Sequence, residues 1–178
     1  DYQDDPDWGK FIGFGFLPSS RNFPDIIRLT SRNFDYKSLK AGIVALEFEK
    51  ADKSKPLLAP ANLPSSSARI VVVKKNKAVL RKFVKDLKSI KTPRHEIPAL
   101  IIDDESDQAS VNTTNPNKWK GRLPGSEERT AINKSISDLL TLLPRAQYVG
   151  YTATPFANVF VDPSDAQDIF PRDFLISL

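Results

Sequence analysis

Residues 99–107 have the sequence ALIIDDESD, in which four apolar residues are followed by five acidic or hydroxyl-bearing residues. An unbroken run of four apolar residues is typical of a short strand buried on both faces of a parallel sheet. The run ends abruptly in acidic residues, which places carboxylates at the carboxyl end of the predicted strand. Ligands of open parallel sheets bind beyond that end of the strands. The acidic residues are therefore candidates for a binding or catalytic site.

Elements with matching patterns lie on both sides of this stretch. The β-branched run Ile70 to Val73 predicts a strand covered on both faces, and residues 147–151 predict another. Asn76 is a candidate N-cap for an amphipathic helix with a basic outer surface, and a second helix is expected between Ser126 and Pro144. Strand, helix, strand, helix, strand indicates an α/β fold with a parallel sheet flanked by helices.

The pattern divides the chain into two portions. Residues 1–68 form a less regular N-terminal portion, in which residues 26–30 predict a short strand and residues 36–50 fit a helix and a strand equally well. Residues 50–67, rich in Pro, Ser, Ala and Lys, predict a long loop. Residues 69–178 carry the regular strand and helix pattern.

Composition excludes several classes of chemistry. The 178 residues carry a formal net charge of +4, no cysteine and one histidine. Without cysteine there is no disulfide framework, thiolate metal site or cysteine nucleophile, and the single His95 disfavours Ser-His-Asp catalysis. No apolar run has the length of a membrane span, so we expect no membrane partner and a cytoplasmic location. The chain also lacks methionine, and we expect it to be a piece of a longer or processed polypeptide.

Two polar clusters follow neighbouring predicted strands. The first is the acidic run at residues 103–107, and the second is Thr-Ala-Thr-Pro at residues 152–155. A strand that ends in consecutive acids suits a nucleotide-bound Mg²⁺, which prefers oxygen ligands and needs few from the protein. A neighbouring Glu can then orient or deprotonate the attacking water. Alone, the acidic run fits a solvated turn equally well.

The two clusters together resemble motifs of a known family. IIDDESD at residues 101–107 resembles the Walker B or DEAD-type motif of superfamily-two helicases, and GYTATP at residues 150–155 resembles their third motif. The longer strings LIIDDESDQASVNT, YVGYTATPFANVF and DIFPRDFLISL are similar to the endonuclease family that carries the domain called Z-one. The resemblance spans about residues 69–178. It implies a RecA-like domain of a helicase-like ATPase that acts on DNA in restriction or defence.

The resemblance assigns roles residue by residue. Asp104 would be the acid on the magnesium side, and Glu105 the base that activates water. Asp107 would close the acidic motif and contact Thr152 and Thr154, and these threonines would couple the nucleotide state to DNA binding. The cofactor-binding residues implied by the resemblance are Asp104, Asp107, Thr152 and Thr154. Two departures are visible, since Ser106 stands where the motif often has Ala, and Asp103 is an extra acid before it.

A larger departure concerns the phosphate-binding loop. The sequence contains no Gly-x-x-x-x-Gly-Lys-Ser/Thr, the loop that cradles the phosphates in such ATPases. We expect this loop and the second RecA-like domain in other parts of the same polypeptide. ATP and Mg²⁺ are then cofactors of the intact protein, and the piece alone should bind ATP poorly and hydrolyse none.

A second function class is metal-dependent nuclease chemistry. Asp25, together with Asp35 and Lys37, matches the bare PD-(D/E)xK pattern, in which two carboxylates hold a metal and the lysine assists the attacking water. The pattern is short and often arises by chance. The structural alternative is that Asp25 begins a strand and Lys37 lies on the surface.

A third class is a non-catalytic module that binds DNA or another partner. Lys74, Lys75 and Lys77 follow the strand predicted at residues 70–73, where they could contact DNA phosphates. Trp119 lies between two lysines and could stack on a base. The alternatives are a solvated helix face and a tryptophan that packs on its own domain.

Overall fold

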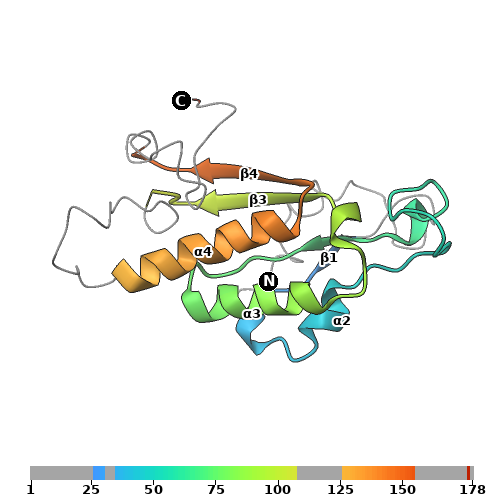
Figure 1. The fold of residues 1–178 in the computed structure, drawn as a ribbon, viewed down its shortest axis with the longest axis horizontal. Coiled ribbons are helices and arrows are strands. Elements are labelled where there is room, and N and C mark those ends of the chain that lie inside the picture. The colour runs from blue at the N-terminus through green and yellow to red at the C-terminus, as the bar shows by residue number, and fades with distance from the viewer. Residues whose placement is uncertain (1–25, 31–34, 108–125, 155–175, 177–178) are drawn as a thin grey trace, which may run out of the picture.

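The computed structural model describes residues 26–30, 35–107, 126–154 and 176. This part of the chain is mixed α/β, with two pairs of parallel strands and the helices around them (Figure 1). The strand pairs are β1 (Ile26–Arg28) with β2 (Ala68–Ile70), and β3 (Ala99–Asp104) with β4 (Ala146–Tyr151). The α-helices are α2 (Gly42–Leu46), α3 (Lys77–Ser89) and α4 (Ser126–Leu142). Three 3-10 turns, η2 (Tyr36–Ser38), η3 (Leu63–Ser65) and η4 (Arg94–Glu96), complete the described elements.

Most of these helices and strands lie where the sequence pattern predicted them. The parallel pairing of β3 with β4 across α4 is confirmed. Asn76 is the N-cap of α3, and its side-chain oxygen accepts hydrogen bonds from the backbone N–H of Ala78 (2.8 Å) and Val79 (3.4 Å). The ambiguous residues 36–50 contain η2 and α2 and no strand.

The strand predicted at Ile70 to Val73 is wrong over most of its length. β2 ends at Ile70, and residues 71–73 belong to no described ladder. The hydroxyl of Thr30 accepts a hydrogen bond from Val72 N at 2.8 Å, so a side chain satisfies this donor where a ladder carbonyl was expected. Val72 is also 59% exposed, in contrast to the predicted burial.

The expectation that residues 99–102 are buried on both faces is also wrong within this structure. Burial alternates along β3, and Leu100 and Ile102 are 61% and 62% exposed. Only the face that carries Ala99, Ile101 and Asp103 is turned toward the described core. The alternation follows from the two-residue period of a strand, since covering elements lie on one side.

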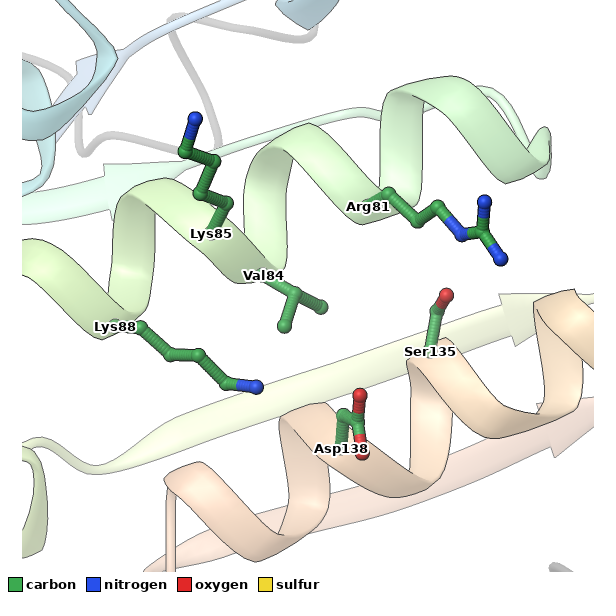
Figure 2. Close-up of a pocket in the computed structure, with 6 residues that line it drawn as sticks. All are labelled: Arg81, Val84, Lys85, Lys88, Ser135 and Asp138. Carbon is green, nitrogen blue, oxygen red and sulfur yellow. The ribbon is translucent and has the colours of Figure 1, made fainter.

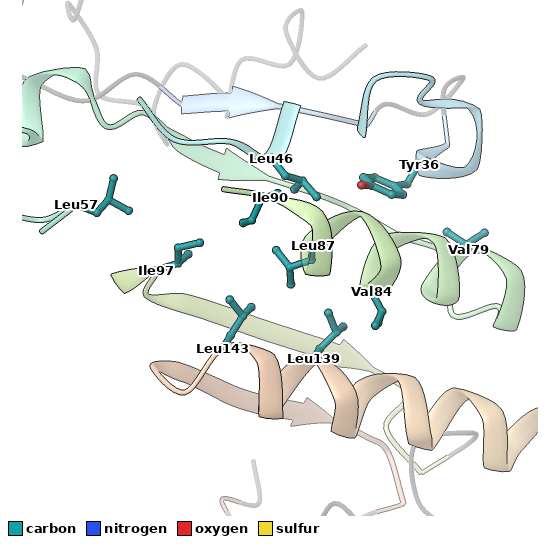
Figure 3. Packing of buried hydrophobic residues seen from close by; sticks show 10 residues of the cluster. All are labelled: Tyr36, Leu46, Leu57, Val79, Val84, Leu87, Ile90, Ile97, Leu139 and Leu143. Carbon is teal, nitrogen blue, oxygen red and sulfur yellow. The ribbon is translucent and has the colours of Figure 1, made fainter. Parts of the chain in front are cut away.

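The main hydrophobic core lies where α3 and α4 pack against each other and against the strands (Figure 3). Leu87 of α3 and Leu139 of α4 are both 5% exposed, and Tyr36 contributes a fully buried ring. The Tyr36 hydroxyl donates to Asp86 Oδ2 at 3.0 Å, and burial, followed by this hydrogen bond, raises the pKa of the tyrosine. Residues from both sides of the boundary predicted at 68–69 share this core.

The long loop predicted at residues 50–67 is present, with only turns and η3 in it. Asn62 is fully buried and organises it, since its side-chain nitrogen donates to the carbonyls of Asp52 (3.0 Å) and Pro56 (2.9 Å). Lys50 and Glu96 form an ion pair at 2.7 Å that ties the start of the loop to η4. Within the described ranges, no helix is long and apolar enough to cross a membrane.

Candidate active site at the carboxyl ends of β3 and β4

The register of β3 and β4 brings the two polar clusters together. Asp104 at the end of β3 lies opposite Tyr151 at the end of β4, so both clusters begin at the same edge. One further hydrogen bond, from Ser106 N to the carbonyl of Tyr151 (2.9 Å), holds the turn after β3 against the end of β4. The acidic turn, defined here as residues 103–107, therefore lies beside the threonine segment, residues 152–154.

Asp107 joins these two segments directly. Its Oδ1 accepts a hydrogen bond from the Thr152 hydroxyl, and its Oδ2 accepts one from the Thr154 hydroxyl, each at 2.5 Å. Thr152 also accepts from the backbone N–H of Thr154 at 3.0 Å, which shapes the segment into a tight turn. We call this arrangement of Asp107, Thr152 and Thr154 the clasp.

The clasp favours the ionised form of Asp107. The hydrogen bonds from Thr152 and then Thr154 lower the pKa of the Asp107 carboxyl below its usual range, against a smaller opposing effect of burial. A carboxylate that accepts hydrogen bonds on both oxygens is stabilised as the anion. Asp107 is therefore a charged structural link at neutral pH and no candidate proton donor there.

Asp104 and Glu105 are the accessible acids of the turn. Both residues are exposed, and Asp104 Oδ1 accepts a hydrogen bond from Glu105 N at 3.1 Å. Glu105 has a φ of 52°, the only positive value among the described non-glycine residues. Such backbone conformations cost energy and occur where the surroundings enforce them, often at functional sites. The structure thus presents two carboxylates on a constrained turn at the strand ends.

The turn can approach β4 closely because residue 150 is glycine. A Cβ at Gly150 would lie 2.7 Å from Ser106 Oγ, which is closer than real Cβ contacts, and 3.0 Å from Ser106 Cβ, which is a tight contact. Ser106 is only 2% exposed, which accounts for a small residue at this position of the motif. Gly150 and Ser106 therefore set the spacing between the acidic turn and β4.

Asp103, the extra acid before the motif, has a different role from its neighbours. It is 7% exposed, and its Oδ1 pairs with the ammonium of Lys75 at 2.8 Å. Its Oδ2 accepts a hydrogen bond from the Tyr148 hydroxyl at 2.6 Å. This network was not predicted from the sequence. The two-residue period of β3 could have revealed it, since it puts Asp103 on the same face as Ile101.

The acidic turn suits a magnesium ion that arrives with a nucleotide. Among the residues that the structure describes, no group of three or more His, Cys, Asp or Glu side chains could hold a metal ion alone. Nucleotide-bound Mg²⁺ needs only one or two protein carboxylates, because phosphates and water supply the other oxygens. Asp104 is exposed, and its Oδ1 accepts the hydrogen bond from Glu105 N, whereas no described residue donates a hydrogen bond to its Oδ2.

The other predicted site residues are distributed as follows. Lys74 is exposed and Lys77 is half-buried at the start of α3, while Lys75 is held by the acidic turn. Trp119 and Asp25 lie outside the described residues, so the nuclease and base-stacking hypotheses stay predictions. Of the remaining nuclease candidates, Asp35 precedes η2 and Lys37 is exposed on it. His95 is exposed, as expected.

A second surface feature is a groove of about 300 Å³ between α3 and α4 (Figure 2). Its lining residues are Arg81, Val84, Lys85, Lys88, Ser135 and Asp138. The cationic side chains do not converge on one point, since Lys85 points away from α4 while Lys88 extends along the groove toward Asp138. The groove therefore shows a basic helix face and no site built for a single anion.

Searches of protein-family models, curated proteins and solved structures found no match to the chain.

Proposed function

We propose that the chain is part of the first RecA-like domain of a helicase-type ATPase. The intact protein couples ATP hydrolysis to translocation along DNA or remodelling of DNA, in the setting of DNA restriction in the cytoplasm. Its partners are DNA and the rest of the same polypeptide, which supplies the phosphate-binding loop and the second RecA-like domain.

The clasp is the observation that carries this proposal. Asp107 binds Thr152 and Thr154, which are 45 and 47 residues away in the sequence, and so connects the two motif-like segments. A solvated acidic turn without a function would not be expected to bond both hydroxyls of the threonine segment that follows β4. In an ATPase that drives motion, a rigid connection of this kind would transmit a change at the nucleotide to the segment that follows β4.

The exposed acids have separate tasks in this proposal. Asp104 offers a carboxylate oxygen to the nucleotide-borne Mg²⁺, and that ion would neutralise charge on the phosphates during transfer. Glu105 orients the attacking water and accepts its proton on the side-chain carboxylate. Asp103 takes no part in the reaction, because Lys75 and Tyr148 engage its two oxygens.

The test is magnesium-dependent ATP turnover by the intact polypeptide, with and without DNA. We expect Glu105→Gln to lower kcat about 100-fold or more while the KM for ATP changes little, since general-base loss acts on the chemical step. Glu49→Gln, at an exposed glutamate before the long loop, is the matched control and should leave kcat unchanged.

The clasp makes a further distinction possible. Thr154→Val should retain ATP turnover in the absence of DNA and lose most of the stimulation by DNA, because it removes one contact between the motifs. The proposal fails if the intact protein shows no ATP turnover, or if Glu105→Gln is as active as the wild type.

A further inference from the structure

The ammonium of Lys75 lies among three oxygens of the acidic turn. Lys75 Nζ donates to Asp103 Oδ1 at 2.8 Å and to the carbonyl oxygens of Asp104 and Glu105 at 2.7 Å each. The three acceptors come from three successive residues. One cation therefore contacts the backbone of both residues that carry the exposed carboxylates.

The surroundings fix this cation in place. Lys75 immediately precedes Asn76, the N-cap of α3, so its backbone is anchored at a helix start. Its side chain is 23% exposed and that of Asp103 only 7%. A buried carboxylate is costly unless it is paired, and Lys75 together with the Tyr148 hydroxyl satisfies Asp103.

The contact also explains the unusual backbone of Glu105. Carbonyls of adjacent residues do not normally converge on one donor in a strand, where they alternate in direction. At Glu105, with a φ of 52°, the backbone leaves the strand and both carbonyls reach Lys75 Nζ. The hydrogen bonds from the ammonium compensate for the cost of this left-handed conformation.

We propose that Lys75 is a positioning residue for the reaction of Glu105 and Asp104, in place of the DNA contact that its sequence position suggested. It acts as a built-in cation that holds the acidic turn in the conformation needed for nucleotide turnover. This inference rests on the proposed ATPase function. It assigns Lys75 no contact with substrate.

The first test compares two lysine substitutions in the intact polypeptide at saturating ATP and DNA. Lys75→Met keeps the length of the side chain and removes the charge, and kcat should fall about 100-fold, as expected for a misplaced catalytic group, with KM for ATP changed less than about threefold. Lys85→Met, at an exposed lysine of α3, is the control and should keep the wild-type kcat. In Lys75→Ala, added n-propylammonium should restore part of kcat, whereas the same concentration of Na⁺ should not.

The second test needs no activity. Hydrogen exchange of the intact polypeptide, read by mass spectrometry on peptides that cover residues 99–107, reports whether the turn opens. Lys75→Met should speed exchange at Glu105 and Ser106 about tenfold or more, because a charge-assisted hydrogen bond is lost, while Lys85→Met should not.

The outcomes separate this inference from the proposed function. An inactive wild-type protein with faster exchange in Lys75→Met would refute the ATPase and show only that Lys75 stabilises the acidic turn. If the wild-type protein is active and Lys75→Met has the same kcat, the positioning role of Lys75 is wrong. The same holds if Lys75→Met leaves hydrogen exchange at residues 99–107 unchanged. A fall in kcat that propylammonium does not relieve, accompanied by faster exchange throughout the protein, would also overturn it, since this pattern means general loss of folding.

Discussion

The strength of the clasp can be measured by a double-mutant cycle. Asp107→Ala removes both hydrogen bonds from the threonine hydroxyls, and Thr152→Val removes one of them while keeping the shape of the side chain. A hydrogen bond to a charged group contributes about 1.5–3 kcal/mol when it is well shielded from water. Asp107 and Thr152 are half-buried, so we expect a coupling of about 1 kcal/mol between them.

The assay is urea unfolding of the 178-residue chain and its single and double variants. The cycle cancels the loss of the other Thr152 contacts, the hydrogen bond from Thr154 N and the 3.5 Å contact with the Thr154 hydroxyl, because these losses occur in both backgrounds. The control is Thr141→Val, which removes a hydroxyl that donates to Ser137 O within α4 and does not touch Asp107. Its coupling to Asp107→Ala should be close to zero.

The pH dependence gives the cycle a second check. The folded-state pKa of Asp107 lies below the ordinary value of about 3.9, so its ionisation stabilises the fold fully above that value. The stabilisation is lost as the pH falls through the lowered folded-state pKa. A coupling below about 0.3 kcal/mol at pH 7, or one that persists unchanged far below pH 4, would refute the clasp.

Two further predictions concern the core and the turn. Leu139→Ala should destabilise the chain by about 2–5 kcal/mol in urea unfolding because it leaves a cavity, whereas Leu100→Ala should cost about 1 kcal/mol because that side chain is 61% exposed. Equal losses would mean that the outer face of β3 is covered. Gly150→Ala should cost about 1–3 kcal/mol by collision with Ser106, and Ser106→Gly in the same chain should recover part of that loss in thermal unfolding; no recovery would contradict the close approach.

The sequence determined the local elements because their causes lie within a few residues of one another. Asn76 caps α3 through its own side chain, and the apolar spacing between Ser126 and Pro144 defines α4. The meeting of the acidic turn with the threonine segment was also predictable, since carboxyl ends of adjacent parallel strands share one edge. At residues 71–73, where the local pattern wrongly predicted a strand, the hydroxyl of the distant Thr30 accepts the hydrogen bond from Val72 N.

The difference in burial and partners among the three acids arises only when the chain folds. The sequence shows Asp103, Asp104 and Glu105 as three similar carboxylates in a row. Folding buries Asp103 against Lys75, which is 28 residues away, and leaves its two neighbours exposed. This division depends on how α3 and β3 are placed relative to each other, and packing between distant segments sets that placement. Lys75, which the sequence suggested as a DNA contact, donates hydrogen bonds in the folded chain to three successive residues of the acidic turn.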